Sequence, residues 1–448
     1  MNSLSRRRLL ALAALAAALP SCGAALPAAP RPVYPSRNLA GVAVRSDLQD
    51  LIDRTARSGG GTVEIPAGQT FLTAGVVVPA GVDLDVRGTI VRQPNARGVL
   101  LTLRGNGATV RGFPGGAVDG NRTAAGERSD VIRVAAADVT ITGLDLSNSA
   151  SNGIAVYGYP RARIESCRIT NCRDNGVIVG NAGGDASLIR GNTLAGTDEQ
   201  NAIFVTASSG STPTRAFVRD HQILDNVITD VGDTGIESGI HTVNTLVRGN
   251  RVEAAKNPGI LLRDCTGVRV ENCTVTTTGP TIDAYAVVPQ TQPSGTEVSS
   301  TFTRCTVVGN ATRSGFYTDS SGVTVDRPTL SPVDGQATRG TAFLAGAVND
   351  LAVLNATLGN WTTAFWLNYA GNDTTMERIT VRAPQINGVD SVYYVPAALT
   401  ESTLECGTVR GVRRYLFRSP GSTTLAPTSQ VVPPAAGSAV GEADTSLP

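Results

Sequence analysis

A short apolar phrase recurs along this chain of 448 residues, and stretches rich in Gly, Asn and Asp separate its copies. The clear copies begin 22, 23, 26, 33 and 24 residues apart. Self-similarity at such a period is typical of one supersecondary unit stacked many times. The copies read DVIRV (Asp130–Val134), NGIAV (Asn152–Val156), NGVIV (Asn175–Val179), NAIFV (Asn201–Val205), TGIES (Thr234–Ser238) and PGILL (Pro258–Leu262), followed by SGFYT (Ser314–Thr318), TAFLA (Thr341–Ala345), TAFWL (Thr363–Leu367), SVYYV (Ser391–Val395) and, more loosely, RYLFR (Arg414–Arg418).

A second alternating segment of about six residues follows each phrase, as in Ile164–Ile169, Ile189–Leu194 and Val247–Val252. No helical periodicity separates the segments, which argues against units of strand, helix and strand. The pattern predicts an all-β fold, a single-stranded right-handed parallel β-helix (a solenoid) of about 11 to 13 coils over residues 45–418. Each strand pairs with its copy one coil on, about 4.8 Å away.

Alignment of the second segments predicts one inward column of side chains. Its members are Leu144, Cys167, Asn192, Asn226, Asn250, Cys273 and Cys305. Three successive asparagines predict a ladder in which each side-chain amide is satisfied by the next coil. The cysteines of the column suit small buried thiols, although Cys167 with Cys172, or Cys273 with Cys305, could pair in an exported protein.

The first 25 residues are predicted to be a targeting segment. Ser5–Leu10 (SRRRLL) resembles a twin-arginine signal, and an apolar run follows to Leu19. Leu19–Cys22 resembles a bacterial lipobox with Cys22 as the acylated residue, and cleavage near Ala25 by an ordinary signal peptidase is the alternative. We therefore expect export by the twin-arginine route to the periplasm, to a membrane lipid anchor or to the medium.

Composition divides the rest of the chain and limits its partners. Residues 26–44 are expected to be a Pro- and Ala-rich linker, and residues 419–448 a disordered tail. The 38 basic and 37 acidic residues nearly cancel, giving a net charge of +1, so no nucleic-acid partner is indicated. We expect a monomer whose membrane contact is limited to Cys22.

An amphipathic helix is predicted ahead of the first strand. Ser46–Gln49 fits a capping box, and Leu48, Leu51, Ile52 and Ala56 share one helical face. Such a helix can plug the open end of a solenoid. The helix, the GGGTVEIPAG segment after it and the repeats together resemble the pectate-lyase-like β-helix superfamily. That resemblance implies polysaccharide lyases, hydrolases or epimerases that act on acidic sugars.

The outward-facing positions of the phrases locate the candidate site. Strand alternation predicts an outward row of Ala155, Ile178, Phe204, Glu237 and Leu261, and beside it Tyr157, Gly180, Thr206, Gly239 and Arg263. Glu237 replaces an apolar residue, and Arg263 lies diagonally beside it. His241 shares the face if its strand continues. Two further features favour a site: the extra length of the coil at Ala207–Phe217, and the charged Asp233 and Lys256 in neighbouring turns.

The resemblance implies a reaction for these residues. A lyase of this superfamily removes the proton α to a uronate carboxylate, with Ca²⁺ or a basic residue neutralising that carboxylate. Glu237 and Asp233 would then be metal ligands for calcium, and Arg263 or Lys256 with His241 would supply the base and the charge. Tyr157, Phe204 and Thr206 would contact the polysaccharide. The arrangement is similar in kind to chondroitinase B and alginate lyases, but their fuller Asn, Glu and Lys pattern is not evident here.

Other chemistries and a non-catalytic role are also compatible with these residues. The NTD, DD, GHG and RIK boxes of polygalacturonases and the boxes of classical pectate lyases are missing. Hydrolysis by Glu237 with Asp230 or Asp233 requires a carboxylate pair at suitable separation. An epimerase, or a non-catalytic β-helix that binds glycans or scaffolds the envelope, also fits, since Glu237 and Arg263 could form an ordinary surface ion pair. Outward Tyr317, Trp366 and Tyr394 could stack on sugar rings.

Overall fold

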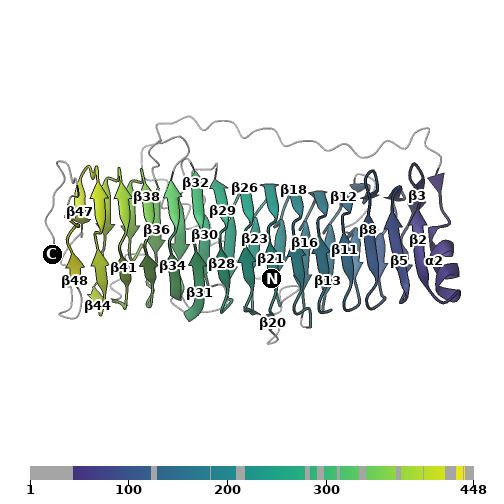
Figure 1. The fold of residues 1–448 in the computed structure, drawn as a ribbon, viewed down its shortest axis with the longest axis horizontal. Helices are drawn as coiled ribbons and strands as arrows, with labels where there is room; N and C mark the ends of the chain where they lie inside the picture. The colour runs from purple at the N-terminus through teal and green to yellow at the C-terminus, as the bar shows by residue number, and fades with distance from the viewer. Residues whose placement is uncertain are drawn as a thin grey trace.

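The computed structural model describes residues 44–122, 129–181, 183–207, 217–277, 283–289, 297–309, 313–331, 340–369, 375–396, 398–418, 430–436 and 438. The predicted signal segment, Cys22, most of the linker and most of the loop at 207–217 lie outside these residues. The described chain winds as a right-handed parallel β-helix, as predicted (Figure 1). Within it, no helix has the length and apolar character needed to cross a bilayer.

Three long parallel sheets run along the solenoid, and each coil contributes one strand to each of them. Sheet A contains β1 (Val44–Arg45), β3 (Thr70–Thr73), β6 (Thr89–Arg92), β9 (Ala117–Asp119), β12 (Asp145–Ser149), β15 (Arg168–Cys172), β18 (Thr193–Thr197), β22 (Val227–Val231), β26 (Arg251–Ala255), β29 (Thr274–Thr277), β32 (Thr306–Gly309), β35 (Thr329–Ser331), β38 (Thr357–Gly359), β42 (Gln385–Asn387) and β46 (Thr408–Arg410). Sheet B contains β2 (Gly61–Ile65), β5 (Val82–Val86), β8 (Thr109–Gly112), β11 (Thr140–Thr142), β14 (Arg163–Glu165), β17 (Leu188–Arg190), β21 (Gln222–Leu224), β25 (Leu246–Arg248), β28 (Arg269–Glu271), β31 (Glu297–Thr303), β34 (Ser321–Asp326), β37 (Ala352–Leu354), β41 (Thr380–Arg382), β45 (Thr403–Glu405) and β48 (Gln430–Val432).

Sheet C is built by the repeated phrases. Its strands are β4 (Val76–Val78), β7 (Leu101–Leu103), β10 (Ile132–Val134), β13 (Ile154–Tyr157), β16 (Val177–Gly180), β19 (Ile203–Val205), β23 (Ile236–Ser238), β27 (Ile260–Arg263), β30 (Asp283–Val288), β33 (Ser314–Thr318), β36 (Thr341–Ala345), β39 (Thr363–Trp366), β43 (Ser391–Tyr394) and β47 (Tyr415–Arg418). Two short pairs, β20 (Val218–Arg219) with β24 (Thr242–Val243) and β40 (Met376–Glu377) with β44 (Leu399–Thr400), lie outside the three sheets.

The predicted inward column lies at the corner between sheets B and A, and all of its members are at least 98% buried. The amide of Asn192 donates to Asn226 Oδ1 at 2.9 Å, and that of Asn226 donates to Asn250 Oδ1 at 2.9 Å. The amide ladder is therefore confirmed. Cys167, Cys172, Cys273 and Cys305 are buried free thiols, so neither of the possible disulfides forms.

The interior of sheet C changes character along the rod. Its early rungs present aliphatic side chains such as Ile154, Val177 and Ile260. From β30 onward the same inward position carries aromatic rings, namely Tyr285, Phe316, Phe343, Phe365, Tyr393 and Phe417. The rings from Tyr285 to Tyr393 lie nearly parallel with centroids 4.8 to 5.5 Å apart. In-register pairing thus stacks them on one another, one per rung.

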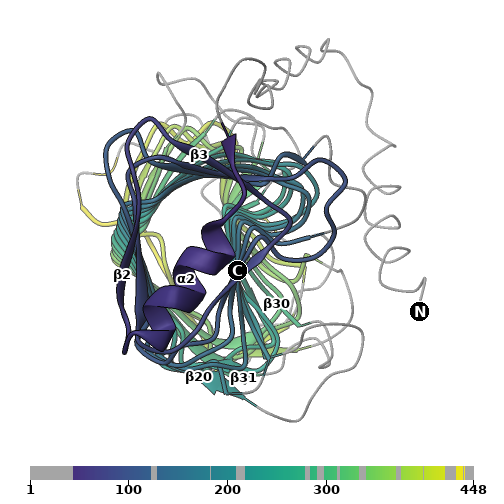
Figure 2. The same cartoon turned by 90° about the vertical axis from the view of Figure 1, so that its right-hand side faces the viewer.

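The predicted N-terminal plug is present, but its start differs from the predicted capping box. Helix α2 (Leu48–Arg57) lies across the end of the first coil, with Leu48 and Ile52 fully buried (Figure 2). Asp47 is the N-cap residue and makes no side-chain cap bond. Gln49 binds the edge strand β4 instead: its Oε1 accepts from Val77 N at 2.8 Å, and its Nε2 donates to Val77 O at 3.2 Å. The helix therefore satisfies backbone groups that an open edge would leave unpaired.

The solenoid extends beyond the boundary predicted at residue 418. Gln430–Val432, which we expected to be part of a disordered tail, forms β48 and pairs in parallel with β45. A single further strand of this kind contains too few residues to show a repeat in the sequence.

Candidate functional site

The outer face of sheet C carries the predicted row of side chains. Strand register places Ala155, Ile178, Phe204, Glu237 and Leu261 in one line across β13, β16, β19, β23 and β27. The row is less open to solvent than strand alternation implies, because Glu237 is 4% exposed and its apolar neighbours Ile178 and Leu261 are also buried. A carboxylate buried in an apolar row must be paired, since leaving it alone costs several kcal/mol.

Glu237 and Arg263 make the predicted contact. Oε1 of Glu237 lies 3.3 Å from Nε of Arg263, and Oε2 accepts a hydrogen bond from Nδ2 of Asn201 at 2.8 Å. Burial raises the pKa of the Glu237 carboxyl, an effect that Arg263 and Asn201 oppose and nearby Asp233 reinforces. The side chain of Arg263 is 31% exposed, so this buried acid has a cationic group that reaches solvent.

Two aromatic rings lean over glycines on the next rung. A Cβ on Gly239 would lie 2.7 Å from Cε2 of Phe204, and a Cβ on Gly180 would lie 3.3 Å from Cδ1 of Tyr157. Only glycine at position 239 leaves room for the Phe204 ring, which lies beside Glu237. Phe204 and Tyr157, both predicted to contact substrate, are half-buried on the outer face.

Other predicted residues are not placed as expected. β23 ends at Ser238, and His241 lies in the following turn with φ of 60° and its ring 5.3 Å from that of Phe217. The strand does not continue to His241, so the prediction that His241 shares the face of Glu237 is wrong. Thr206 is fully buried, which removes it from a ligand-contacting surface. Lys256 is exposed in the turn between sheets A and C.

The residues present do not suit calcium. Asp233 accepts a hydrogen bond from Nδ2 of Asn257, and both oxygens of Glu237 face protein partners. Within the described ranges, no group of three or more His, Cys, Asp or Glu side chains could hold a metal ion. Calcium takes six to eight oxygen ligands, so two carboxylates with other partners do not provide its usual shell.

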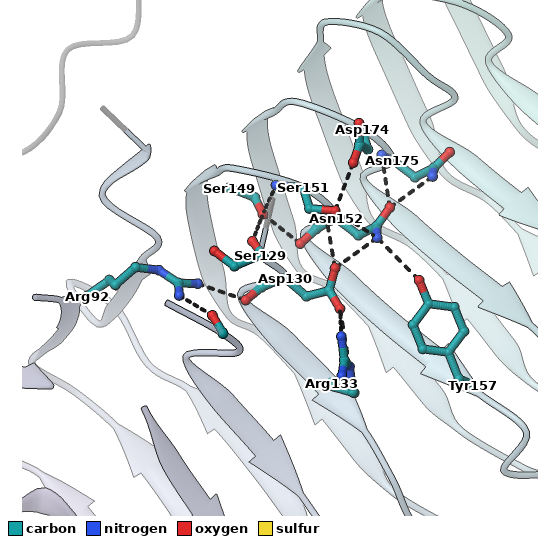
Figure 3. Close-up of polar contacts among 11 residues, drawn as sticks. Arg92, Ser129, Asp130, Arg133, Ser149, Ser151, Asn152, Tyr157, Asp174 and Asn175 are labelled. Carbon is teal, nitrogen blue, oxygen red and sulfur yellow. Dashed lines mark hydrogen bonds and ion pairs between the residues drawn. The ribbon is translucent and has the colours of Figure 1, made fainter. Parts of the chain in front are cut away.

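Sequence reasoning missed a second amide ladder, which lies at the turn between sheets A and C (Figure 3). Nδ2 of Asn152 donates to Asp130 Oδ1 at 2.8 Å, and Nδ2 of Asn175 donates to Asn152 Oδ1 at 2.9 Å. The backbone N–H of Asn201 then donates to Asn175 Oδ1 at 3.2 Å, while the Asn201 amide turns to Glu237. The first residue of each repeated phrase was the available signal. The ladder connects Asp130 with Glu237 across four rungs, roughly 19 Å at the usual strand spacing.

The far end of this ladder resembles the Glu237 site in composition. Asp130 is 3% exposed and pairs with Arg133, whose Nη2 lies 2.7 Å from Asp130 Oδ2. The hydroxyl of Tyr157 accepts from Asn152 Nδ2 at 3.4 Å (Figure 3). Burial, with contributions from Asp130 and Asp174, raises the pKa of Tyr157 to about 12. Tyr157 is therefore a neutral phenol near pH 7, able to donate a hydrogen bond.

The backbone around Asp130 is fixed by a buried arginine. Arg92 is fully buried, and its Nη2 donates to the carbonyl of Asp130 at 2.8 Å (Figure 3). Its Nε donates to the carbonyl of Gly120 at 3.0 Å. Arg92 thus holds the backbone carbonyl of Asp130 in place, and Arg133 pairs with the Asp130 carboxylate.

The family model described as right handed beta helix region matches residues 74–221 and 130–330, together more than half of the chain. Among solved structures, the chain is similar to the A-module of the Azotobacter vinelandii mannuronan C-5 epimerase AlgE6 (14% identity, 90% of this chain and 97% of that chain, TM-score 0.51). It is also similar to a tailspike protein of E. coli bacteriophage HK620 in complex with a pentasaccharide (12%, 86% and 76%, TM-score 0.54) and to PfbA, a surface adhesin of Streptococcus pneumoniae (14%, 72% and 87%, TM-score 0.56). At these identities the likeness shows the fold alone. No curated protein matches the chain.

Proposed function

Because the chain belongs to the right-handed β-helix family, we propose that its sheet C face binds a uronate-containing polysaccharide and removes the proton next to the uronate carboxylate. The observation that carries the proposal is Glu237, a buried acid with a raised pKa beside the partly exposed Arg263. A carboxyl group with a pKa shifted toward neutrality suits proton transfer near pH 7. The names of two neighbours, a mannuronan epimerase and a tailspike bound to a pentasaccharide, support a glycan ligand.

Arg263 and Glu237 have different parts in this chemistry. The guanidinium of Arg263 pairs with the sugar carboxylate and stabilises the negative charge that develops when the adjacent C–H bond breaks. Glu237, held by Asn201, accepts that proton. In elimination, the electrons of the C5–H bond form a C4=C5 double bond, the C4–O bond breaks, and the leaving oxygen takes a proton. In epimerisation, a proton returns to C5 from the opposite face. No step is assigned to calcium.

The test is to incubate the protein with alginate, pectate and glycosaminoglycans in deuterated water. We expect either the absorbance of unsaturated uronate, which reports elimination, or deuterium at C5 by NMR, which reports reversible proton removal or epimerisation. Glu237→Gln and Arg263→Ala should each lower the rate by about a hundredfold or more. Glu199→Gln is the matched control. Glu199 forms an exposed ion pair with Arg173, with Oε1 and Nε 3.0 Å apart, and it lies outside the outward row. New reducing ends without either signal would instead indicate hydrolysis and contradict the proposal.

A non-catalytic glycan-binding protein is the second candidate, and one observation favours it. Both oxygens of Glu237 already have protein partners, as expected of a group that only positions Arg263. For this function the wild-type protein would bind polysaccharide without turnover, and Arg263→Ala would abolish binding.

We further propose that the protein works outside the cytoplasm, through the twin-arginine-like segment and Cys22. Replacement of Arg6 and Arg7 by Lys, followed by cell fractionation, would test this localisation.

A further inference from the structure

The outward row that contains Glu237 continues to the C-terminal end of the rod. Strand register carries it through Leu261, Ala286, Tyr317, Leu344, Trp366 and Tyr394 to Arg418. Trp366 lies five rungs beyond Glu237, roughly 24 Å at the usual strand spacing. Aromatic residues therefore gather on the same face as the candidate site, but too far away to touch a sugar bound at Glu237.

These outer rings are arranged differently from the aromatic stack inside the rod. Trp366 meets Tyr394 at a centroid distance of 4.9 Å and an interplanar angle of 77°, and meets Tyr369 at 5.5 Å and 70°. All three residues are half-buried, whereas the inner rings of Phe365 and Tyr393 are fully buried. The indole N–H of Trp366 is shielded and has no acceptor among the described residues, although buried tryptophans usually find one.

A cation completes the patch. Arg418 is exposed, and its guanidinium lies 5.5 Å from the ring centroid of Tyr394 and 5.4 Å from that of Tyr415. A surface that joins aromatic faces with a solvent-accessible guanidinium matches an acidic sugar in two respects: the C–H face of a pyranose ring packs on an aromatic ring, and its carboxylate pairs with the arginine.

We propose that Trp366, Tyr394 and Arg418 form a second polysaccharide subsite, distinct from the Glu237 site and on the same face of the rod. This inference rests on the proposed function only in taking the same acidic polysaccharide as its ligand. Because the two sites are separated along the solenoid axis, a chain long enough to reach both is bound twice. The second contact then occurs at a high effective concentration. An oligosaccharide too short to span the gap gains nothing from the patch.

The test compares long and short ligands. We expect Trp366→Ala and Arg418→Ala each to weaken binding of polymeric alginate or pectate, whichever the wild-type protein binds, by at least about tenfold in a surface-binding assay. The same variants should retain wild-type binding, and any turnover, of short oligosaccharides. Tyr159→Ala is the matched control, because Tyr159 is an exposed aromatic in the turn after β13, outside the row.

Each outcome separates this inference from the proposed reaction. Wild-type affinity of both variants for the polymer would overturn the second subsite, whatever the activity. If the wild-type protein binds polysaccharide without any turnover, the proposed reaction is overturned. The second subsite is still supported in that case if the two variants bind the polymer more weakly. Arg418→Ala decides the question if Trp366→Ala fails to fold, because an exposed arginine can be truncated without leaving a cavity. Absence of any polysaccharide binding by the wild-type protein would overturn both.

Discussion

Replacing Phe365 with alanine is expected to lower the free energy of unfolding by about 3–5 kcal/mol, the usual cost of deleting a buried aromatic ring. Phe365 is fully buried, and its ring stacks between Phe343, at 5.2 Å, and Tyr393, at 5.1 Å. The deletion interrupts the aromatic stack on both sides at once, and a close-packed interior cannot collapse fully into the gap. Urea unfolding followed by tryptophan fluorescence and circular dichroism measures the effect.

Two controls separate loss of the ring from loss of any apolar surface. Phe365→Leu keeps most of the volume and should cost less than the alanine variant. Tyr159→Ala removes an exposed ring and should change stability by no more than about 0.5 kcal/mol. An alanine variant of Phe365 as stable as that of Tyr159 would show that the inner aromatic stack does not stabilise the solenoid.

Acidification is expected to destabilise the protein through His221. This residue is 1% exposed, and its Nδ1 accepts a hydrogen bond from the backbone N–H of Ser187 at 3.3 Å. Burial lowers the pKa of His221 to about 4, although Asp185 and Asp220 oppose the effect. Between pH 6.5 and 4 the unfolded state therefore binds the proton that the folded state excludes. Stability is full above about pH 6.5 and falls by about 3 kcal/mol as the pH approaches 4.

The pH dependence of the urea midpoint in a His221→Asn variant checks this expectation. Asparagine keeps an acceptor for Ser187 but does not titrate, so the loss between pH 6.5 and 4 should shrink by about 3 kcal/mol. His241→Gln is the matched control, since the sequence has only two histidines and His241 is less buried. An unchanged slope in His221→Asn would mean that other groups cause the acid loss.

The repeat made the fold and two sets of side-chain contacts predictable. Phrases about two dozen residues apart fixed the register, and register alone brought Asn192, Asn226 and Asn250 into a ladder. The same register brought Glu237 to Arg263. In-register parallel pairing is a local rule repeated along the rod, so an alignment of the copies contains the geometry.

The burial of side chains and the course of the turns could not be predicted from the repeat. Alternation indicates that Glu237 faces outward, but its burial depends on neighbours such as the Phe204 ring, which lies over Gly239. His241 was misplaced because the backbone turns after Ser238 instead of continuing as a strand. The ladder that starts at Asp130 was missed because its asparagines, at the first position of each repeated phrase, were not aligned with one another. The amides of these asparagines in fact connect the turns of successive coils by hydrogen bonds.

The location of a bound oligosaccharide tests the central claim most directly: that the outer face of sheet C around Glu237 and Arg263 is the polysaccharide site. A crystal structure of the Glu237→Gln variant with a uronate oligosaccharide is the measurement. We predict that the sugar chain lies across β19, β23 and β27, with a carboxylate paired to Arg263. A sugar chain bound on sheet A or sheet B, with Arg263 untouched, would contradict the claim.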